Sequence, residues 1–192
     1  MWVPFLAASE VVDHQHPAVH EFAAQLRRHT EIETVRGAYE AVRDGFPHSY
    51  DISAPEVSVS ASDVLRHGHG ICFAKAHLLA AVLRACGIRA GFCYQRLLLD
   101  DADPSRTCLH GFNAVLLREL GRWQRLDARG NKPGIEAEFD LSRERLAYQV
   151  RPNLGEHDYP EIYARPPRCV VAALNGSGSI VELDSRLPRD LL

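Results

Sequence analysis

The chain has 192 residues, of which 46% are hydrophobic and 24% are charged, and its formal net charge is -3. This length suffices for one domain with a sizeable core, and the composition is that of a soluble globular protein rather than a disordered or fibrous one. Lysine and arginine are scattered along the chain instead of clustered, which argues against a nucleic-acid partner. We expect a single domain over residues 1–192.

The sequence predicts a cytoplasmic protein with no membrane partner. Its longest strongly apolar run, Leu78 to Leu83, is too short to cross a bilayer, and the N-terminus lacks the basic segment of a secretory signal. The five cysteines are odd in number and irregularly spaced, which favours reduced thiols over a disulfide framework. No pattern specifies an oligomeric state.

Two helices are predicted in the N-terminal part. The first covers residues 17–28, where a proline suits the first turn and apolar residues recur at helical spacing. Thr30 and Glu33 stand in the relation of a capping box before a second helix that ends near Gly45.

A loop with a short extended piece is predicted over residues 46–60. Ser60 or Ser62 can cap a short helix that ends at Arg66.

A nearly uninterrupted apolar helix is predicted from Cys72 to Cys86. Its fifteen positions contain only two fully charged side chains, Lys75 and Arg84, and Gly87 follows as a C-terminal stop. Such a helix is expected to be central and buried.

Three runs rich in apolar, aromatic and β-branched residues follow this helix, at residues 88–100, 108–119 and 122–127. The connection at 119–122 is short enough to force the second and third runs into a hairpin. Beyond Gly134 the signals weaken, and we predict a strand near 145–151 and a short helix near 166–174. The expected fold class is α+β, an antiparallel sheet packed against a helical layer with the Cys72 helix at its centre.

Cys72 stands where nucleophilic chemistry is favoured. A thiol in the first turn of a helix faces the positive end of the peptide dipoles and unpaired N–H groups, which favour the thiolate. His110 and Asp127 lie on the two strands of the predicted hairpin at diagonal positions. If the helix packs against this hairpin, the sulfur lies beside the imidazole, and Asp127 accepts the other ring N–H, as in a serine-protease triad.

Other interpretations of these residues remain open. Cys72 can be a buried structural thiol, because free cysteine is among the most buried residue types; Gly68 and Gly70 before the helix, with the histidine and aspartate on paired strands, favour catalysis. Arginines that could contact an acidic substrate are Arg96, Arg106 and Arg129.

A metal or redox site is a weaker alternative. No CxxC pair, HxxxH pair or carboxylate cluster completes a zinc site around His67, His69, Cys72 and His77, so we predict neither a metal nor a cofactor. Cys108 shares a strand face with His110, which leaves open a disulfide or sulfenate partner for Cys72.

The motif resembles that of the transglutaminase-like superfamily, a branch of the papain-like cysteine enzymes, and in particular its bacterial-type domains. The match covers about residues 60–132 and rests on Gly70, Cys72, Ala74, Leu79, Leu83, Gly87, Ile88, His110, Trp123 and Asp127. Two positions depart from the family pattern: Gly111, where a bulkier residue is frequent, and Ile71, where animal transglutaminases usually carry glutamine.

The resemblance implies a papain-like, transglutaminase-core fold and catalysis by Cys72, His110 and Asp127 through a thioester acyl-enzyme. We therefore predict a cysteine-dependent hydrolase or acyltransferase that acts on amide bonds of a peptide or protein substrate. One oxyanion donor is expected to be the backbone N–H of Cys72, and His48 and Tyr50 are candidates for the second. The alternatives are a non-catalytic peptide-binding module on the same fold and a thiol-based redox or metal sensor.

Overall fold

The computed structural model describes residues 3–191. Within this range, helices α1 to α6 cover Pro17–Leu26, Glu31–Gly45, Ala61–His67, Cys72–Ala85, Arg168–Asn175 and Ile180–Arg186. Strands β1 to β4 cover Ala90–Leu98, Thr107–Leu117, Arg122–Leu126 and His157–Asp158, and short 3₁₀ turns lie at Val3–Leu6 and Pro152–Leu154. The four strands form one antiparallel sheet in the order β3-β2-β1-β4.

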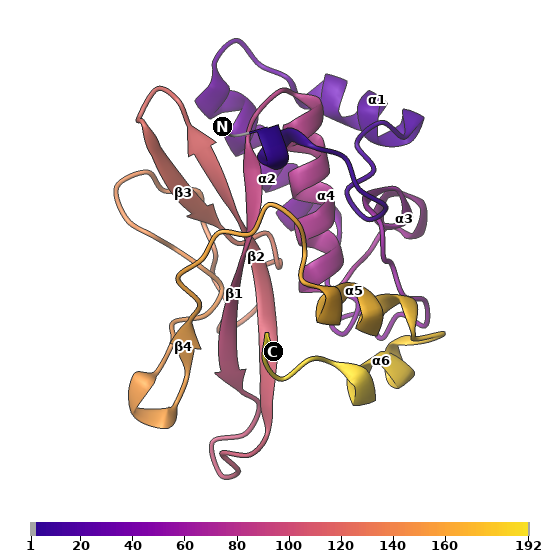
Figure 1. Cartoon of the computed structure of the whole chain (residues 1–192), viewed down its shortest axis with the longest axis vertical. Coiled ribbons are helices and arrows are strands. Elements are labelled where there is room, and N and C mark those ends of the chain that lie inside the picture. The colour runs from indigo at the N-terminus through magenta and orange to yellow at the C-terminus, as the bar shows by residue number, and fades with distance from the viewer. Residues whose placement is uncertain (1–2, 192) are drawn as a thin grey trace.

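Helix α4 lies between the sheet and the other N-terminal helices. It packs against β1 and β2 on one side, while α1, α2 and α3 cover its other side (Figure 1). Twelve of its fourteen residues are buried, as the apolar sequence predicts. The predicted α+β fold with the Cys72 helix at its centre is confirmed, whereas the prediction of one domain over residues 1–192 stays a prediction.

The predicted helix starts agree with the caps in the structure. The side chain of Thr30 accepts the N–H of Glu33 at 3.1 Å, and the Glu33 carboxylate accepts the N–H of Thr30 at 3.2 Å. At the start of α3, Ser60 is the capping residue and accepts the N–H of Asp63 at 3.1 Å. Each such cap contributes about 1 kcal/mol to helix stability.

The two charged side chains of α4 are buried and act as anchors for loops around the helix. Lys75 donates its Nζ protons to three carbonyl oxygens, those of Arg43, Phe46 and Arg129. Arg84 likewise donates to three carbonyl oxygens, those of Ala7, Ala90 and Ala164. Because a buried cation is tolerated only when its donors are paired, these bonds hold distant segments against the central helix.

The predicted strand at 145–151 is wrong, because this segment is irregular. Two of its central backbone groups bond to side chains instead of to a neighbouring strand. The N–H of Ala147 donates to Asp127, and the carbonyl of Tyr148 accepts from the side chain of Gln95. The helix predicted near 166–174 is present as α5, whereas β4 and α6 were not predicted.

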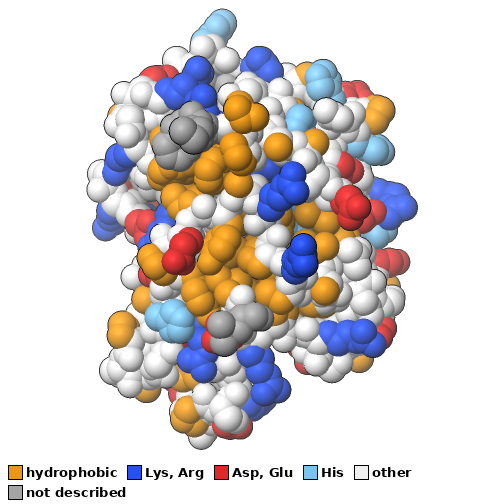
Figure 2. Space-filling view, in the orientation of Figure 1, with side chains coloured by type: hydrophobic (Ala, Val, Ile, Leu, Met, Phe, Trp, Pro, Cys, Tyr) orange, Lys and Arg blue, Asp and Glu red, His pale blue; other side chains and the backbone are white. Residues whose placement is uncertain are grey.

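A second, smaller apolar cluster lies on the sheet face turned away from α4. Asn113 faces α4, since its side chain donates to the carbonyl of Ala76, so its strand neighbours point to the opposite face. That cluster consists of Cys93, Phe112, Ala114 and Leu146, with Trp123 and Ile162 packed against it. The segment between β4 and α5 runs along the edge of β1, where Tyr163 pairs with Phe92, and Figure 2 shows hydrophobic side chains gathered over the middle of the molecule in this view. No helix within residues 3–191 is long and apolar enough to span a bilayer.

Candidate active site

Two glycines shape the turn that leads to Cys72. Gly68 ends α3 in the left-handed conformation (φ 77°), which glycine adopts without strain. Gly70 then pairs with the preceding loop: its N–H donates to the carbonyl of Pro47 at 3.3 Å, and its carbonyl accepts the N–H of Ser49 at 3.2 Å. Helix α4 begins immediately afterwards with Cys72, whose side chain is partly exposed.

His110 lies on β2, and Asp127 follows the last residue of β3. The β2–β3 register sets Asp127 opposite residue 112, diagonal to the histidine. The Nε2–H of His110 donates to Oδ2 of Asp127 at 2.8 Å, and the two side chains are only 4% and 1% exposed. The carboxylate also accepts the backbone N–H groups of Ala147 at 3.0 Å and of Arg129 at 3.1 Å.

The electrostatics of this pair favour the charged forms. Burial by itself would lower the pKa of His110, but the Asp127 carboxylate and the Cys72 thiol outweigh it and raise the pKa to about 10. Burial would raise the pKa of Asp127, yet His110 and the two backbone donors hold it below its ordinary value. Because Asp127 occupies Nε2, the ring nitrogen left for the Cys72 sulfur is Nδ1.

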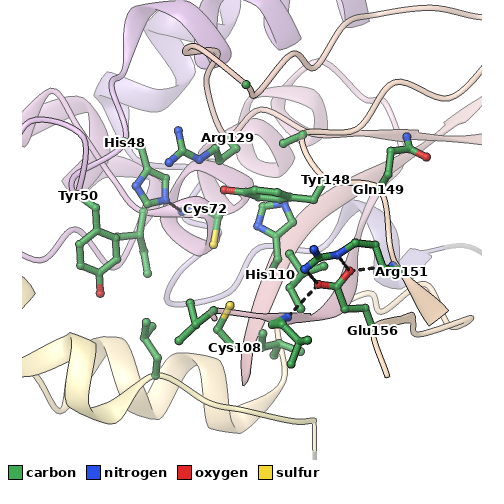
Figure 3. A pocket seen from close by; sticks show the side chains of 18 of the residues that line it. His48, Tyr50, Cys72, Cys108, His110, Arg129, Tyr148, Gln149, Arg151 and Glu156 are labelled. Carbon is green, nitrogen blue, oxygen red and sulfur yellow. Dashed lines mark hydrogen bonds and ion pairs between the residues drawn. The ribbon is translucent and has the colours of Figure 1, made fainter. Parts of the chain in front are cut away.

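Cys72 and His110 line a pocket of about 580 Å³ (Figure 3). Tyr148 packs edge-on against His110, with ring centroids 4.9 Å apart at an interplanar angle of 82°. Its hydroxyl points toward Cys72 and lies beside the guanidinium of Arg129 (Figure 3). Burial raises the pKa of Tyr148, so the phenol keeps its proton. Arg129 is 5% exposed and pairs with Asp51 at 3.0 Å.

His48 and Tyr50, the predicted oxyanion candidates, both line the pocket, and their rings stack with centroids 5.6 Å apart. The backbone N–H of Cys72 donates to Nε2 of His48 at 3.1 Å. Burial lowers the pKa of His48 to about 3, so the ring is neutral and its proton lies on Nδ1. His48 therefore accepts the N–H that was expected to face an oxyanion.

A close packing contact lies beside the cysteine and the histidine. Phe73 follows Cys72, Gly111 follows His110, and the two neighbours touch. A Cβ atom at position 111 would lie 2.6 Å from the Phe73 ring, closer than real Cβ contacts come, and 3.1 Å from the ring of Tyr94, which is also tight. The bulkier residue that the family motif frequently has after the histidine would not fit here.

Tyr148 was not predicted as part of the site, and Arg129 was considered only as a contact for an acidic substrate. A local signal existed for Arg129: an aspartate side chain commonly accepts the backbone N–H two residues further on, and Asp127 does so. No local signal marks Tyr148, because its place depends on the long-range bond between the preceding Ala147 and Asp127.

The remaining histidines considered as metal ligands are engaged within the protein. One ring nitrogen, Nδ1, is bonded at 3.0 Å to a serine hydroxyl in His67 and His69, and at 2.7 Å to a carbonyl oxygen in His77. These contacts favour a structural role for the three side chains.

Cys108 lines the same pocket as Cys72, as the shared strand face of Cys108 and His110 predicts. Burial raises the pKa of Cys108 to about 12, which disfavours the thiolate that disulfide formation requires. Arg96 and Arg106 are engaged with the carbonyl of Gly155 at 3.0 Å and with Asp100 at 3.7 Å.

Comparisons with known proteins place the chain in a family. The model of the transglutaminase-like superfamily matches residues 20–128. The solved structure of a candidate cysteine protease from Cytophaga hutchinsonii is similar, with a TM-score of 0.52 and 19% identity over 67% of this chain and 42% of that one. A candidate protease from Parabacteroides distasonis matches with a TM-score of 0.46 and 18% identity over 65% of this chain and 26% of that one.

The chain thus spans less than half the length of these two solved structures. The likeness to the first of them, together with the family match, confirms the predicted transglutaminase-like fold. No match was found among curated proteins.

Proposed function

The chain belongs to the transglutaminase-like superfamily, and on this premise we propose that it is a cysteine-dependent hydrolase or acyltransferase acting on amide bonds of a peptide or protein. One observation carries the proposal: the thiol at the start of α4 and His110, which is hydrogen-bonded to Asp127, line one pocket. A nucleophile, a base and a group that orients the base are the minimum that covalent acyl transfer requires.

In the proposed mechanism, the imidazolium of His110 and the N-terminus of α4 stabilise the Cys72 thiolate. The thiolate attacks the amide carbonyl, which forms a C–S bond and a tetrahedral oxyanion. His110 then gives its Nδ1 proton to the leaving nitrogen as the C–N bond breaks, leaving a thioester on Cys72. Water or an amine attacks the thioester, and His110 takes up the proton that this nucleophile loses; the C–S bond then breaks, which releases the acyl product and returns Cys72 as the thiolate.

Tyr148 is our candidate for the second oxyanion donor. A guanidinium group can only donate hydrogen bonds, so Arg129 leaves the hydroxyl proton of Tyr148 free for another acceptor. That hydroxyl points toward Cys72 (Figure 3). The N–H of Cys72 becomes available as the first donor when His48 gives up its present bond to it.

Tyr148→Phe is expected to slow acylation of Cys72 by p-nitrophenyl acetate about 100-fold, the usual effect of losing one oxyanion donor. Alkylation by iodoacetamide should keep its rate, because alkylation forms no oxyanion. Release of p-nitrophenolate measures the first rate and mass spectrometry the second. Tyr159→Phe, which removes a hydroxyl bonded to Asp190 outside the pocket, is the control. Equal slowing of both reactions in Tyr148→Phe would contradict its role as a donor.

The pH dependence of iodoacetamide alkylation at Cys72 tests the proposed function itself. An ordinary cysteine titrates near pH 8.5. Since the pKa of His110 is raised to about 10, the imidazolium persists through the neutral range and favours the thiolate there. We expect fast alkylation well below pH 8.5 in the wild type and slow alkylation in His110→Ala.

Cys86 and Cys169, which are also partly exposed, provide internal references in the same digest. A Cys72 profile that matches theirs and does not respond to His110→Ala would refute the enzyme proposal and favour the binding-module alternative.

A further inference from the structure

One side of the candidate pocket consists of leucine side chains. They come from the end of β1, the start of β2 and the segment after α6, and are Leu97, Leu98, Leu99, Leu109 and Leu187; we call this set the leucine wall. Leu99 is 58% exposed although it lines the pocket. Apolar surface that stays open to water inside a concave site is available to a ligand.

The leucine wall is held in place by backbone hydrogen bonds. Leu97 pairs with Cys108 across β1 and β2, and the N–H of Leu99 is bonded across the same hairpin at 2.8 Å. The N–H of Leu109 donates to the carbonyl of Pro188 at 3.0 Å, which ties the segment after α6 to β2. The wall is therefore formed before any ligand binds, so little ordering of the protein opposes binding.

The charged side chains of the pocket disfavour an acidic ligand. Arg129 is paired with Asp51, and Arg151 is paired with Glu156 at 2.7 Å. Asp184 also lines the pocket, and it forms no ion pair with any residue in the described range 3–191. The positive charges are thus neutralised locally, while one negative charge is left to repel a carboxylate.

We propose that the leucine wall binds the aliphatic side chain of the residue on the acyl side of the scissile amide, an inference that rests on the proposed function. The acyl part of the substrate becomes joined to Cys72 in the first half-reaction and is released from it in the second, whereas the amine leaves in the first. Apolar surface in the pocket of Cys72 can therefore contact the acyl part in the transition states of both steps. The substrate class is a peptide with a leucine-like residue at this position.

Three p-nitrophenyl esters with one leaving group test the proposal: those of Nα-acetyl-leucine, Nα-acetyl-lysine and Nα-acetyl-aspartate. In the wild type, acylation by the leucine ester is expected to be faster than by the aspartate ester by at least about tenfold, with the lysine ester between them. Leu99→Asp is expected to slow acylation by the leucine ester on the order of tenfold and to accelerate acylation by the lysine ester.

Leu120→Asp is the matched control. Leu120 is 42% exposed and lies in the turn between β2 and β3, away from the pocket. Because both leucines are exposed, neither substitution buries a charge, and Leu120→Asp should leave all three rates unchanged.

Equal rates for the three esters in the wild type, or equal effects of the two substitutions, would overturn the inference. Alkylation of Cys72 by iodoacetamide distinguishes this failure from failure of the proposed function. Fast alkylation without ester preference overturns the substrate class alone, whereas slow alkylation at neutral pH overturns both.

Discussion

Cys72→Ala is expected to abolish acylation by p-nitrophenyl acetate, with a loss on the order of 10⁵-fold or more. The thermal unfolding temperature should change little. Cys72 lies at the first turn of α4 with its side chain partly exposed to the pocket, so removing the sulfur leaves no sealed cavity. Calorimetry and the burst of p-nitrophenolate measure the two effects.

Cys86→Ala provides the control at the other end of the same helix. Cys86 caps α4 and is also partly exposed. Its replacement by alanine therefore removes the same atoms as Cys72→Ala does, at a position that does not line the pocket. Acylation should persist in this variant. Cys72 would be identified as a structural thiol if Cys72→Ala lowered the thermal unfolding temperature by several degrees and the wild type showed no acylation.

Asp127→Asn is expected to reduce acylation about 10³- to 10⁴-fold, as loss of the orienting carboxylate does in related triads. Both oxygens of Asp127 now accept hydrogen bonds, Oδ2 from His110 and Ala147 and Oδ1 from Arg129, so an asparagine turns its NH₂ group toward a donor in either orientation. The imidazole then loses its orientation, although the nucleophile stays, so residual activity is expected.

The pH profile of the Asp127→Asn variant gives a second measurement. In the wild type, the carboxylate and the Cys72 thiol together raise the pKa of His110 to about 10 from an ordinary value of 6.5. The stability that this charged pair contributes is complete below pH 6.5 and is lost as pH rises through about 10. Without the carboxylate, burial lowers the pKa of His110, so the alkaline limb of acylation should move to lower pH. If the alkaline limb stayed at the same pH in Asp127→Asn, Asp127 would not be acting on the imidazole.

The parts of the fold set by local patterns could be predicted from the sequence. The capping pair Thr30 and Glu33, and the apolar run after Cys72, contain their own start and stop signals. The juxtaposition of His110 and Asp127 followed from the short turn between β2 and β3, because turn length determines which residues face each other across a hairpin.

The parts that depend on contacts between distant segments could not be predicted. Tyr148 reaches the pocket because residues 145–151 leave the sheet, and they leave it because a backbone N–H is bonded to Asp127 twenty residues earlier. The strand β4 has two residues and exists only through its pairing with β1. The bond from Cys72 to His48 likewise depends on the bridge between His48 and Gly70.

The contact between Phe73 and Gly111 restricts which residues can occupy these two positions beside the reactive pair. Each residue adjoins one partner of the reaction, and the glycine has no room for even a methyl group beside that ring. A larger residue at position 111 therefore requires a smaller one at position 73, so the two positions are expected to covary among descendants of this chain. For a protein engineer, the two positions therefore form a single unit that has to be changed together, next to the sulfur and the imidazole but without altering either group.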